Sequence, residues 1–492
     1  MASLQSQNFQ EAISEFKSAI ERDPADAAAH DGLGVALAEL GSITEALAEF
    51  QKATSLSDDL APAHFHLALA YDRTGQPRLA IAEYEATLRI EPADVDTRYS
   101  LSAACWKLGD REGAIALLQQ IIQQNPPFAA EAWYNLGIEL RETGELQKAT
   151  EALQAALAKK PEYPAAYVAL GRIETERQEF DAAVRALRKA LELAPNNAEY
   201  HYTLGEALRL KGDFDGAALE FHRALTLTPP WALSHRQLGI VLRQKGDYAA
   251  AKTELQQAVE VDRSDAQAHY YLGSVLMQLN DFEGAVAALN QAVHLDTYDS
   301  AAHMTLAAAL ARTDKTQESE EQRKEAQALD KLKANAGQSR VLVGSAAEHL
   351  QRGDIDTAVN ELRQAVKLSP EYPEAQLQLG RALLRTGSHD AEGIQGLRRA
   401  IELEDDDARA HFALGLALER TGQRLESLSE LRRAAELAPS LAEAHREIAK
   451  AAVASEDWKT VISESTAILA WNPTDAAARK DLLLAKQHLG HL

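Results

Sequence analysis

A repeating period of 34 residues constrains the fold of this chain more than any other feature of its sequence. Between Ala198 and Asp330 the same residue types return at this step in several columns. The clearest columns are His201, His235, His269 and His303; Leu204, Leu238, Leu272 and Leu306; Gly205, Gly239 and Gly273; and Ala217, Ala251 and Ala285. A fixed period of about 20–50 residues is typical of an array in which one supersecondary unit stacks on copies of itself.

One unit, residues 198–231, shows what each repeat encodes. Apolar residues follow a three- and four-residue spacing around Leu204, which predicts an amphipathic helix. Gly212 breaks this pattern, and a second stripe of the same kind continues to Thr228, where two prolines end it. The unit is therefore predicted to be two antiparallel helices joined by a short turn. Small residues such as Gly205 would allow the two helices to approach closely.

This pattern resembles the tetratricopeptide repeat, a helix–turn–helix unit of about 34 residues. The best single match is the stretch from Trp133 to Tyr163. The residues at the family's positions are Trp133, Leu136, Gly137, Gly144, Ala149, Ala156 and Pro161. The run Asn135-Leu136-Gly137 is typical of bacterial and archaeal members. The resemblance covers nearly the whole chain and implies an all-α fold, a right-handed superhelical α-solenoid of about 13 stacked helix pairs.

The repeat pattern also divides the chain into segments. The predicted segments are a partial N-terminal repeat with only its second helix (1–26), a first array (27–315), a degenerate charged helix (316–338), a second array (339–475) and a C-terminal capping helix (476–492). In the degenerate segment Ser319 replaces a small alanine, and the run from Ala334 to Gln338 interrupts the register. We interpret 316–338 as a hinge or sub-domain boundary. The alternative is one poor repeat tolerated within a continuous array.

Composition excludes several classes of function. The 492 residues include 51 basic and 74 acidic ones, a net charge of −23, so a nucleic-acid partner is not expected. Cys105 is the single cysteine, which excludes an intrachain disulfide and a thiolate metal site. No apolar run is long enough to span a membrane, and the first residues lack a signal-like hydrophobic core. We expect a soluble protein with a basic or amphipathic partner, in the cytoplasm unless a leader was removed before Met1.

The histidines that recur once per repeat do not predict a metal site. Zinc needs donors that converge to about 2 Å of one ion, whereas equivalent residues of stacked helix pairs are on the order of 10 Å apart. These positions match the family's aromatic packing site, which Trp133 and Tyr167 fill in other units. Motifs of nucleophilic, metalloprotease, phosphate-loop and dinucleotide sites are absent. We therefore predict no enzymatic activity, no catalytic residues, no metal and no cofactor.

The resemblance implies that the first helix of each repeat lines the concave side of the superhelix. Aromatic residues and arginines gather at the positions that would face this groove. The candidate groove residues are Tyr99, Trp106, Tyr134, Arg141, Arg172, Tyr202, Arg209, Arg236, Arg243 and Tyr270. Tyrosine, tryptophan and arginine anchor binding because they offer large contact areas and bidentate or stacking contacts. We predict a non-enzymatic protein–protein interaction scaffold that binds a peptide or protein segment in this groove.

Two alternative functions fit the same sequence. The chain begins with a lone second helix and ends with a lone first helix, so head-to-tail self-association into a filament would complete a repeat at each junction. Against this, Lys480, Lys486 and Gln487 favour a solubilising cap on the last helix. The chain is also consistent with the substrate-selecting repeat portion of a larger enzyme.

Overall fold

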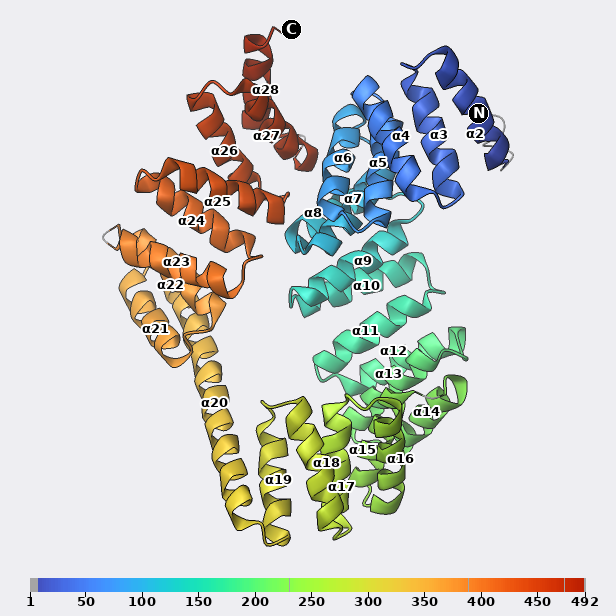
Figure 1. The fold of residues 1–492 in the computed structure, drawn as a ribbon, viewed down its shortest axis with the longest axis vertical. Helices are drawn as coiled ribbons and strands as arrows, with labels where there is room; N and C mark the ends of the chain where they lie inside the picture. Colours follow the sequence, from blue (N-terminus) through green and yellow to red (C-terminus); the bar gives the residue numbers. More distant parts are fainter. Residues whose placement is uncertain (1–7, 230, 388, 473, 491–492) are drawn as a thin grey trace. The chain divides into compact units, whose positions relative to one another are not determined.

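The computed structural model describes residues 8–229, 231–387, 389–472 and 474–490. Regular structure in these residues consists of twenty-seven α-helices and no strand (Figure 1). The predicted all-α repeat fold is therefore confirmed. The chain divides into two compact units: unit 1 comprises Met1–Glu139 and Leu342–Leu492, and unit 2 comprises Leu140–Val341. Residues 1–7 of the predicted partial repeat and residues 491–492 of the predicted capping segment lie outside the described residues.

Unit 2 consists of helices that pair in chain order. They are the end of α9 (Ala129–Glu142), α10 (Leu146–Lys159), α11 (Pro164–Glu176), α12 (Phe180–Leu193), α13 (Ala198–Lys211), α14 (Phe214–Leu227), α15 (Ala232–Gln244), α16 (Tyr248–Val261), α17 (Ala266–Gln278), α18 (Phe282–Leu295), α19 (Ser300–Arg312) and most of α20 (Thr316–Arg352). Within a repeat the first helix packs along the second, as α13 does on α14, and the second helix then packs on the first helix of the next repeat.

In several helix pairs a glycine of the first helix faces a large side chain of the second. A Cβ atom at Gly205 would lie 2.7 Å from Cε1 of Phe221, and one at Gly239 would lie 2.6 Å from Cγ of Leu255. Phe221 and Leu255 are both fully buried. The predicted role of the small residues in close helix approach is therefore confirmed. Between the helices, Gly212 ends α13 in the left-handed conformation that glycine adopts without strain (φ 88°).

Unit 1 contains two segments of the chain that lie far apart in sequence. The N-terminal segment contains α2 (Phe9–Arg22), α3 (Ala27–Glu39), α4 (Ile43–Leu56), α5 (Ala61–Arg73), α6 (Pro77–Ile90), α7 (Val95–Leu108), α8 (Arg111–Gln124) and most of α9. The C-terminal segment contains the end of α20, α21 (Ile355–Leu368), α22 (Pro373–Thr386), α23 (Asp390–Leu403), α24 (Ala408–Arg420), α25 (Arg424–Leu437), α26 (Ala442–Ala454), α27 (Trp458–Trp471) and α28 (Ala476–His488).

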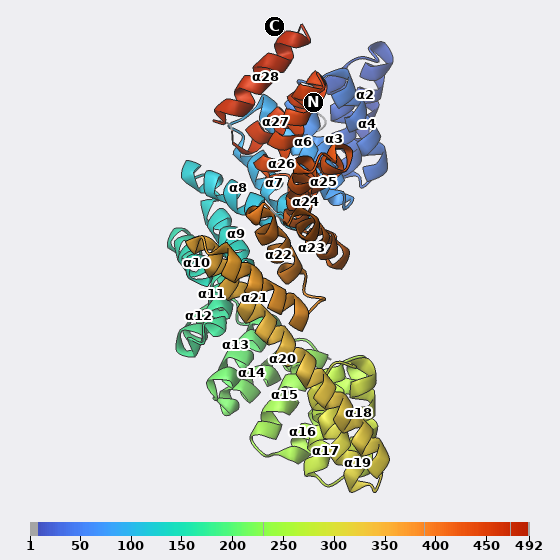
Figure 2. The same ribbon diagram turned by 90° about the vertical axis from the view of Figure 1, so that its left-hand side faces the viewer.

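The two segments of unit 1 contact each other directly, and α27 lies beside α6 (Figures 1 and 2). Trp471 Nε1 donates a hydrogen bond of 2.8 Å to Glu85 Oε1, and Gln120 Nε2 donates one of 2.9 Å to the Trp471 carbonyl. Asp110 accepts hydrogen bonds from the backbone N–H and the hydroxyl of Ser440 at 3.0 and 2.8 Å. No feature of the repeat pattern predicts this contact, because each repeat specifies only its immediate neighbours.

The stability of unit 1 is expected to fall as pH rises from about 5 to 8. Burial raises the pKa of Glu85 from 4.5 to about 7, while His445 and Trp471 act in the opposite direction and Glu464 and Asp110 reinforce the rise. The folded state therefore binds more protons than the unfolded state between these two pKa values, and ionisation of Glu85 destabilises it. Burial lowers the pKa of His445, but Glu464 and Glu85 outweigh burial and the net shift is upward. Its stabilising contribution is also lost as pH rises.

Denaturant unfolding of the wild type and of Glu85→Gln across this pH range measures the effect. We expect unit 1 of the wild type to lose about 2–3 kcal/mol, and unit 1 of Glu85→Gln to lose much less, because within this unit only the His445 contribution remains. Equal pH profiles for the two proteins would show that Glu85 does not titrate in this way.

Helix α20 corrects one expectation from the sequence. The sequence predicts a degenerate charged helix over 316–338, in which the run from Ala334 to Gln338 interrupts the register of the repeats. The helix is longer than predicted, because α20 runs without interruption from Thr316 to Arg352. Helix-favouring Ala, Gln and Lys residues surround Gly337, and a single glycine in a helix interior costs only about 1 kcal/mol. The boundary between the two units lies inside this helix, and a hinge at 316–338 stays a prediction.

Candidate binding face of the first helices

In unit 2 several predicted groove residues lie on consecutive first helices that contact one another, α13, α15 and α17. We call this surface the first-helix face and define it by Tyr202, Glu206, Arg209, Arg236, Arg243 and Tyr270. All six side chains are partly buried. The face therefore combines arginines with aromatic rings.

Tyr202 connects several groups of the face. Its hydroxyl donates a hydrogen bond of 3.1 Å to Glu206 Oε1, and its ring centre lies 5.0 Å from that of Trp231 and 5.7 Å from that of Phe221. Burial raises the pKa of Tyr202 to about 12, and the nearby Glu206 adds to the rise. Burial also raises the pKa of Glu206, which Tyr202 and Arg209 partly oppose. The phenol thus stays a neutral hydrogen-bond donor near neutral pH.

Three arginines of the face retain unused hydrogen-bond donors. Arg236 Nη1 donates to both carboxylate oxygens of Asp265 at 2.7 Å, and Arg243 Nη1 donates to Ser274 Oγ at 3.2 Å. The Nε groups of Arg209, Arg236 and Arg243 are nevertheless buried, and no described residue accepts a hydrogen bond from them. A buried donor without an acceptor costs about 1–3 kcal/mol. Acceptor oxygens of a ligand would remove this cost.

The other two predicted arginines of unit 2 connect neighbouring repeats. Arg141 Nε on α9 donates to Glu176 Oε1 on α11 at 2.7 Å, and Arg172 Nη2 on α11 donates to Glu199 Oε1 on α13 at 2.7 Å. Exposed ion pairs of this kind contribute about 0–1 kcal/mol each. The structure therefore places these arginines on first helices, as predicted, but their guanidinium groups already have carboxylate partners.

The three predicted residues of unit 1 lie on α7 and α9. The Tyr99 ring packs edge-on against Phe128 with centres 5.2 Å apart, and the Tyr99 hydroxyl accepts a hydrogen bond of 2.9 Å from Asn135. Trp106 is 47% exposed and stacks with the guanidinium of Arg111, which lies 5.4 Å from the ring centre. Tyr134 on α9 is partly buried. In this unit Trp106 therefore offers the largest exposed aromatic surface among the predicted residues.

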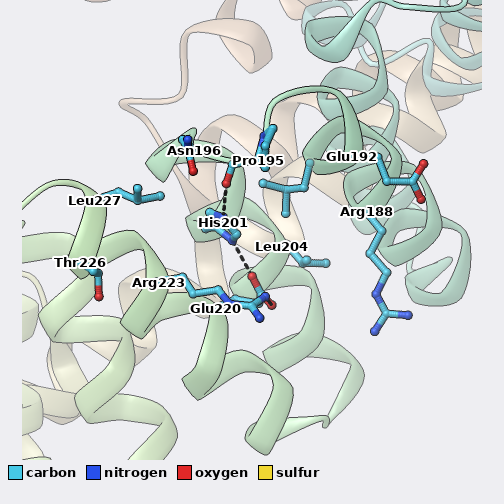
Figure 3. A pocket seen from close by; sticks show the side chains of 11 residues that line it. Arg188, Glu192, Pro195, Asn196, His201, Leu204, Glu220, Arg223, Thr226 and Leu227 are labelled. Atoms are coloured by element: carbon cyan, nitrogen blue, oxygen red, sulfur yellow. Dashed lines mark hydrogen bonds and ion pairs between the residues drawn. The ribbon is translucent and has the colours of Figure 1, made fainter.

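The recurring histidines have a partner that the sequence analysis missed. His201 Nδ1 lies 2.6 Å from Glu220 Oε2, and His201 Nε2 lies 2.9 Å from the Pro195 carbonyl oxygen. Both contacts are drawn in Figure 3. Glutamate or glutamine 19 residues after the histidine plays the same part in other repeats. These pairs are His30–Glu49, His64–Glu83, His235–Glu254, His303–Gln322, His411–Glu430 and His445–Glu464. The rings therefore do more than pack: they connect the two helices of a repeat. The signal for these pairs in the sequence was a glutamate that recurs 19 residues after the histidine in several repeats.

A pocket of about 660 Å³ includes the His201–Glu220 pair in its lining, which comes from α12, α13, α14 and the loop between α12 and α13 (Figure 3). Glu220 also accepts a hydrogen bond of 2.7 Å from Arg223, so these three lining groups bond to one another. In the described part of the chain, no group of three or more His, Cys, Asp and Glu side chains is placed to hold a metal ion.

This architecture defines an α-helical repeat protein with a polar and aromatic face on its first helices. A family model described as tetratricopeptide repeat matches residues 1–62, 65–127, 106–164, 134–183, 236–302 and 275–332. Further models of the same repeat match residues 171–209, 198–231, 347–387 and 408–441. The chain belongs to the tetratricopeptide repeat family. Proteins of this family are generally non-catalytic, which supports a general role as a protein–protein interaction scaffold.

Several solved structures match this chain at low sequence identity. MamA from Desulfovibrio magneticus RS-1 is 26% identical over 34% of this chain and 94% of its own, with a TM-score of 0.32. The APC/C hetero-tetramer Cut9-Hcn1 is 16% identical over 92% and 95%, with a TM-score of 0.38. YrrB, a TPR protein with an unusual peptide-binding site, is 19% identical over 46% and 96%, with a TM-score of 0.30. No curated protein sequence matches the chain. Within the described residues, no helix combines the length and apolarity needed to cross a membrane.

Proposed function

We propose that this protein is a non-enzymatic interaction scaffold whose first-helix face binds a peptide segment carrying carboxylate and apolar side chains. The observation that carries the proposal is the set of three arginine Nε–H groups, on Arg209, Arg236 and Arg243, that are buried without an acceptor in the described structure. They lie on two consecutive first helices, α13 and α15, and Tyr202 lies on the first of these. An extended peptide presents carbonyl oxygens along its backbone, and acidic side chains present more.

The charge and the rings of the face favour the same ligand. Its arginines outnumber its carboxylates, although the whole chain carries a net charge of −23. Tyr270 packs edge-on against Tyr271 with ring centres 5.1 Å apart, and the Arg243 guanidinium lies 5.1 Å from the Tyr271 ring centre. Arginines and tyrosines held in this way lose little side-chain entropy on binding. The face is thus pre-organised for a segment that alternates acidic and apolar residues.

Selection from a displayed peptide library tests the proposal with the full chain as bait. We expect enrichment of segments rich in Asp or Glu and in apolar residues. The affinity of an enriched peptide, measured by fluorescence polarisation, is expected to fall about 30-fold in Arg209→Glu and in Tyr202→Ala, because these residue types form binding hot spots. Arg185→Glu, on the second helix α12, is the matched charge reversal and should bind as wild type does. Unchanged affinity in both first-helix variants, or no enriched peptide, would overturn the proposal.

A further inference from the structure

A second pocket, of about 650 Å³, lies within unit 1 where its two segments meet. The end of α6 and the start of α7 line one side, and α27 and α28 line the other. Leu88, Ile90, Leu469 and Leu482 supply an apolar lining. Pockets of about 300–1,000 Å³ with mostly apolar walls and a few polar groups are typical of small-molecule sites.

Arg98, which lines this pocket, occupies the histidine column of its repeat, 34 residues after His64. Arg98 makes one of the two contacts that the histidines of this column make. Its Nη2 donates a hydrogen bond to the carbonyl oxygen of Pro92, six residues earlier, and His64 Nε2 contacts the carbonyl oxygen of Asp58 in the same way. The other contact is missing. His64 forms a hydrogen bond with Glu83, 19 residues later, but the residue 19 positions after Arg98 is the buried Leu117. This repeat therefore supplies a permanent cation without the carboxylate that pairs with the corresponding ring elsewhere.

The guanidinium of Arg98 is consequently left with unused donors. Arg98 is only 5% exposed, and its Nε and Nη1 are buried without an acceptor among the described residues. Burial lowers the pKa of Arg98, and the nearby Asp94 opposes this shift. A carboxylate is the natural partner for such a group, because its two oxygens match the donor geometry of a guanidinium.

The surroundings of Arg98 also favour an anion. Arg89, Arg479 and Lys486 line the same pocket, together with Asp58 and Asp59. Asp58 pairs with Arg89 at 3.4 Å. The cationic lining groups thus outnumber the acidic ones. In the pocket beside His201, by contrast, the carboxylate of Glu220 already bonds to the side chain that occupies the position equivalent to Arg98.

We propose that the pocket of unit 1 binds a small amphiphilic carboxylate, with the carboxylate on Arg98 and the apolar body against Leu88, Leu469 and Leu482. This site shares no residue with the first-helix face, so either proposal can fail without the other.

Isothermal titration of the full chain with dodecanoate tests the site, with dodecanol as the matched ligand that lacks the carboxylate. We expect dodecanoate to bind, dodecanol to bind far more weakly, and Arg98→Gln to weaken dodecanoate binding about 10- to 100-fold through loss of a charged hydrogen-bond donor. Arg98→Lys keeps the charge and should retain part of the affinity. Arg22→Gln removes one cation on α2, outside the pocket, and should have no effect.

A double variant guards against misfolding of Arg98→Gln. Arg98→His combined with Leu117→Glu rebuilds the pair found in other repeats, so it should keep the circular dichroism of the wild type and lose dodecanoate binding. A peptide with an apolar C-terminal residue and a free carboxylate is the second ligand source. If dodecanoate or the peptide binds in a way that depends on Arg98, the proposal is supported, and the ligand that binds identifies the source. Binding of inorganic phosphate alone, no binding, or equal binding in the Arg98 variants would overturn it.

Discussion

Replacing Phe221 with alanine is expected to lower the free energy of unfolding of unit 2 by about 3–5 kcal/mol. The ring is fully buried and lies against Gly205, where an added Cβ atom would come within 2.7 Å of it. Because Gly205 has no side chain that could move into the vacated space, the truncation leaves a cavity between α13 and α14. Tyr202, whose ring centre lies 5.7 Å from that of Phe221, would also lose packing.

The residues at the equivalent position of neighbouring repeats indicate a control substitution for Phe221. Leu187, Leu255 and Leu289 occupy the position of Phe221 in neighbouring repeats, each against its own glycine. Phe221→Leu should therefore cost less than about 1.5 kcal/mol. Denaturant unfolding followed by circular dichroism compares the wild type with both variants. Similar losses in Phe221→Leu and Phe221→Ala would contradict the cavity explanation and indicate that this column requires an aromatic ring.

Replacing Trp471 with alanine is expected to destabilise unit 1 by a similar amount, about 3–5 kcal/mol. The indole is 7% exposed and belongs to the same apolar cluster as Tyr84 and Leu117 of the N-terminal segment. The substitution also removes the Nε1–H donor from Glu85, whose pKa burial already raises. The loss should therefore weaken the contact between α27 and α6 in particular.

Amide hydrogen exchange locates this second effect. In Trp471→Ala we expect faster exchange in both α6 and α27, although the substitution lies in α27 alone. Trp458→Ala is the control on the same helix, because Trp458 stacks on His488 of α28 with ring centres 4.1 Å apart, within the C-terminal segment. It should leave α6 unchanged. Protection of α6 that is the same in Trp471→Ala and in wild type would show that the indole does not hold the two segments together.

Much of the candidate site was predictable from the sequence, but its pairing was not. The 34-residue spacing correctly placed Tyr202, Arg236 and Arg243 on first helices of unit 2. It could not show that Arg236 bonds to Asp265, since that carboxylate also caps the first helix of the next repeat. Side-chain partners depend on rotamers and on the distance between neighbouring helices, and residue spacing does not specify these.

The sequence by itself determined the local architecture of this protein. A 34-residue period with glycine opposite Phe221 or a leucine defines antiparallel helix pairs, because only such spacing buries an apolar stripe on both helices. The tertiary structure alone decided three features: the continuity of α20, the contact of Trp471 with Glu85, and the pocket that Arg98 lines together with α27 and α28. The last two features depend on residues from distant repeats, whereas a repeat period encodes contacts only between neighbouring repeats.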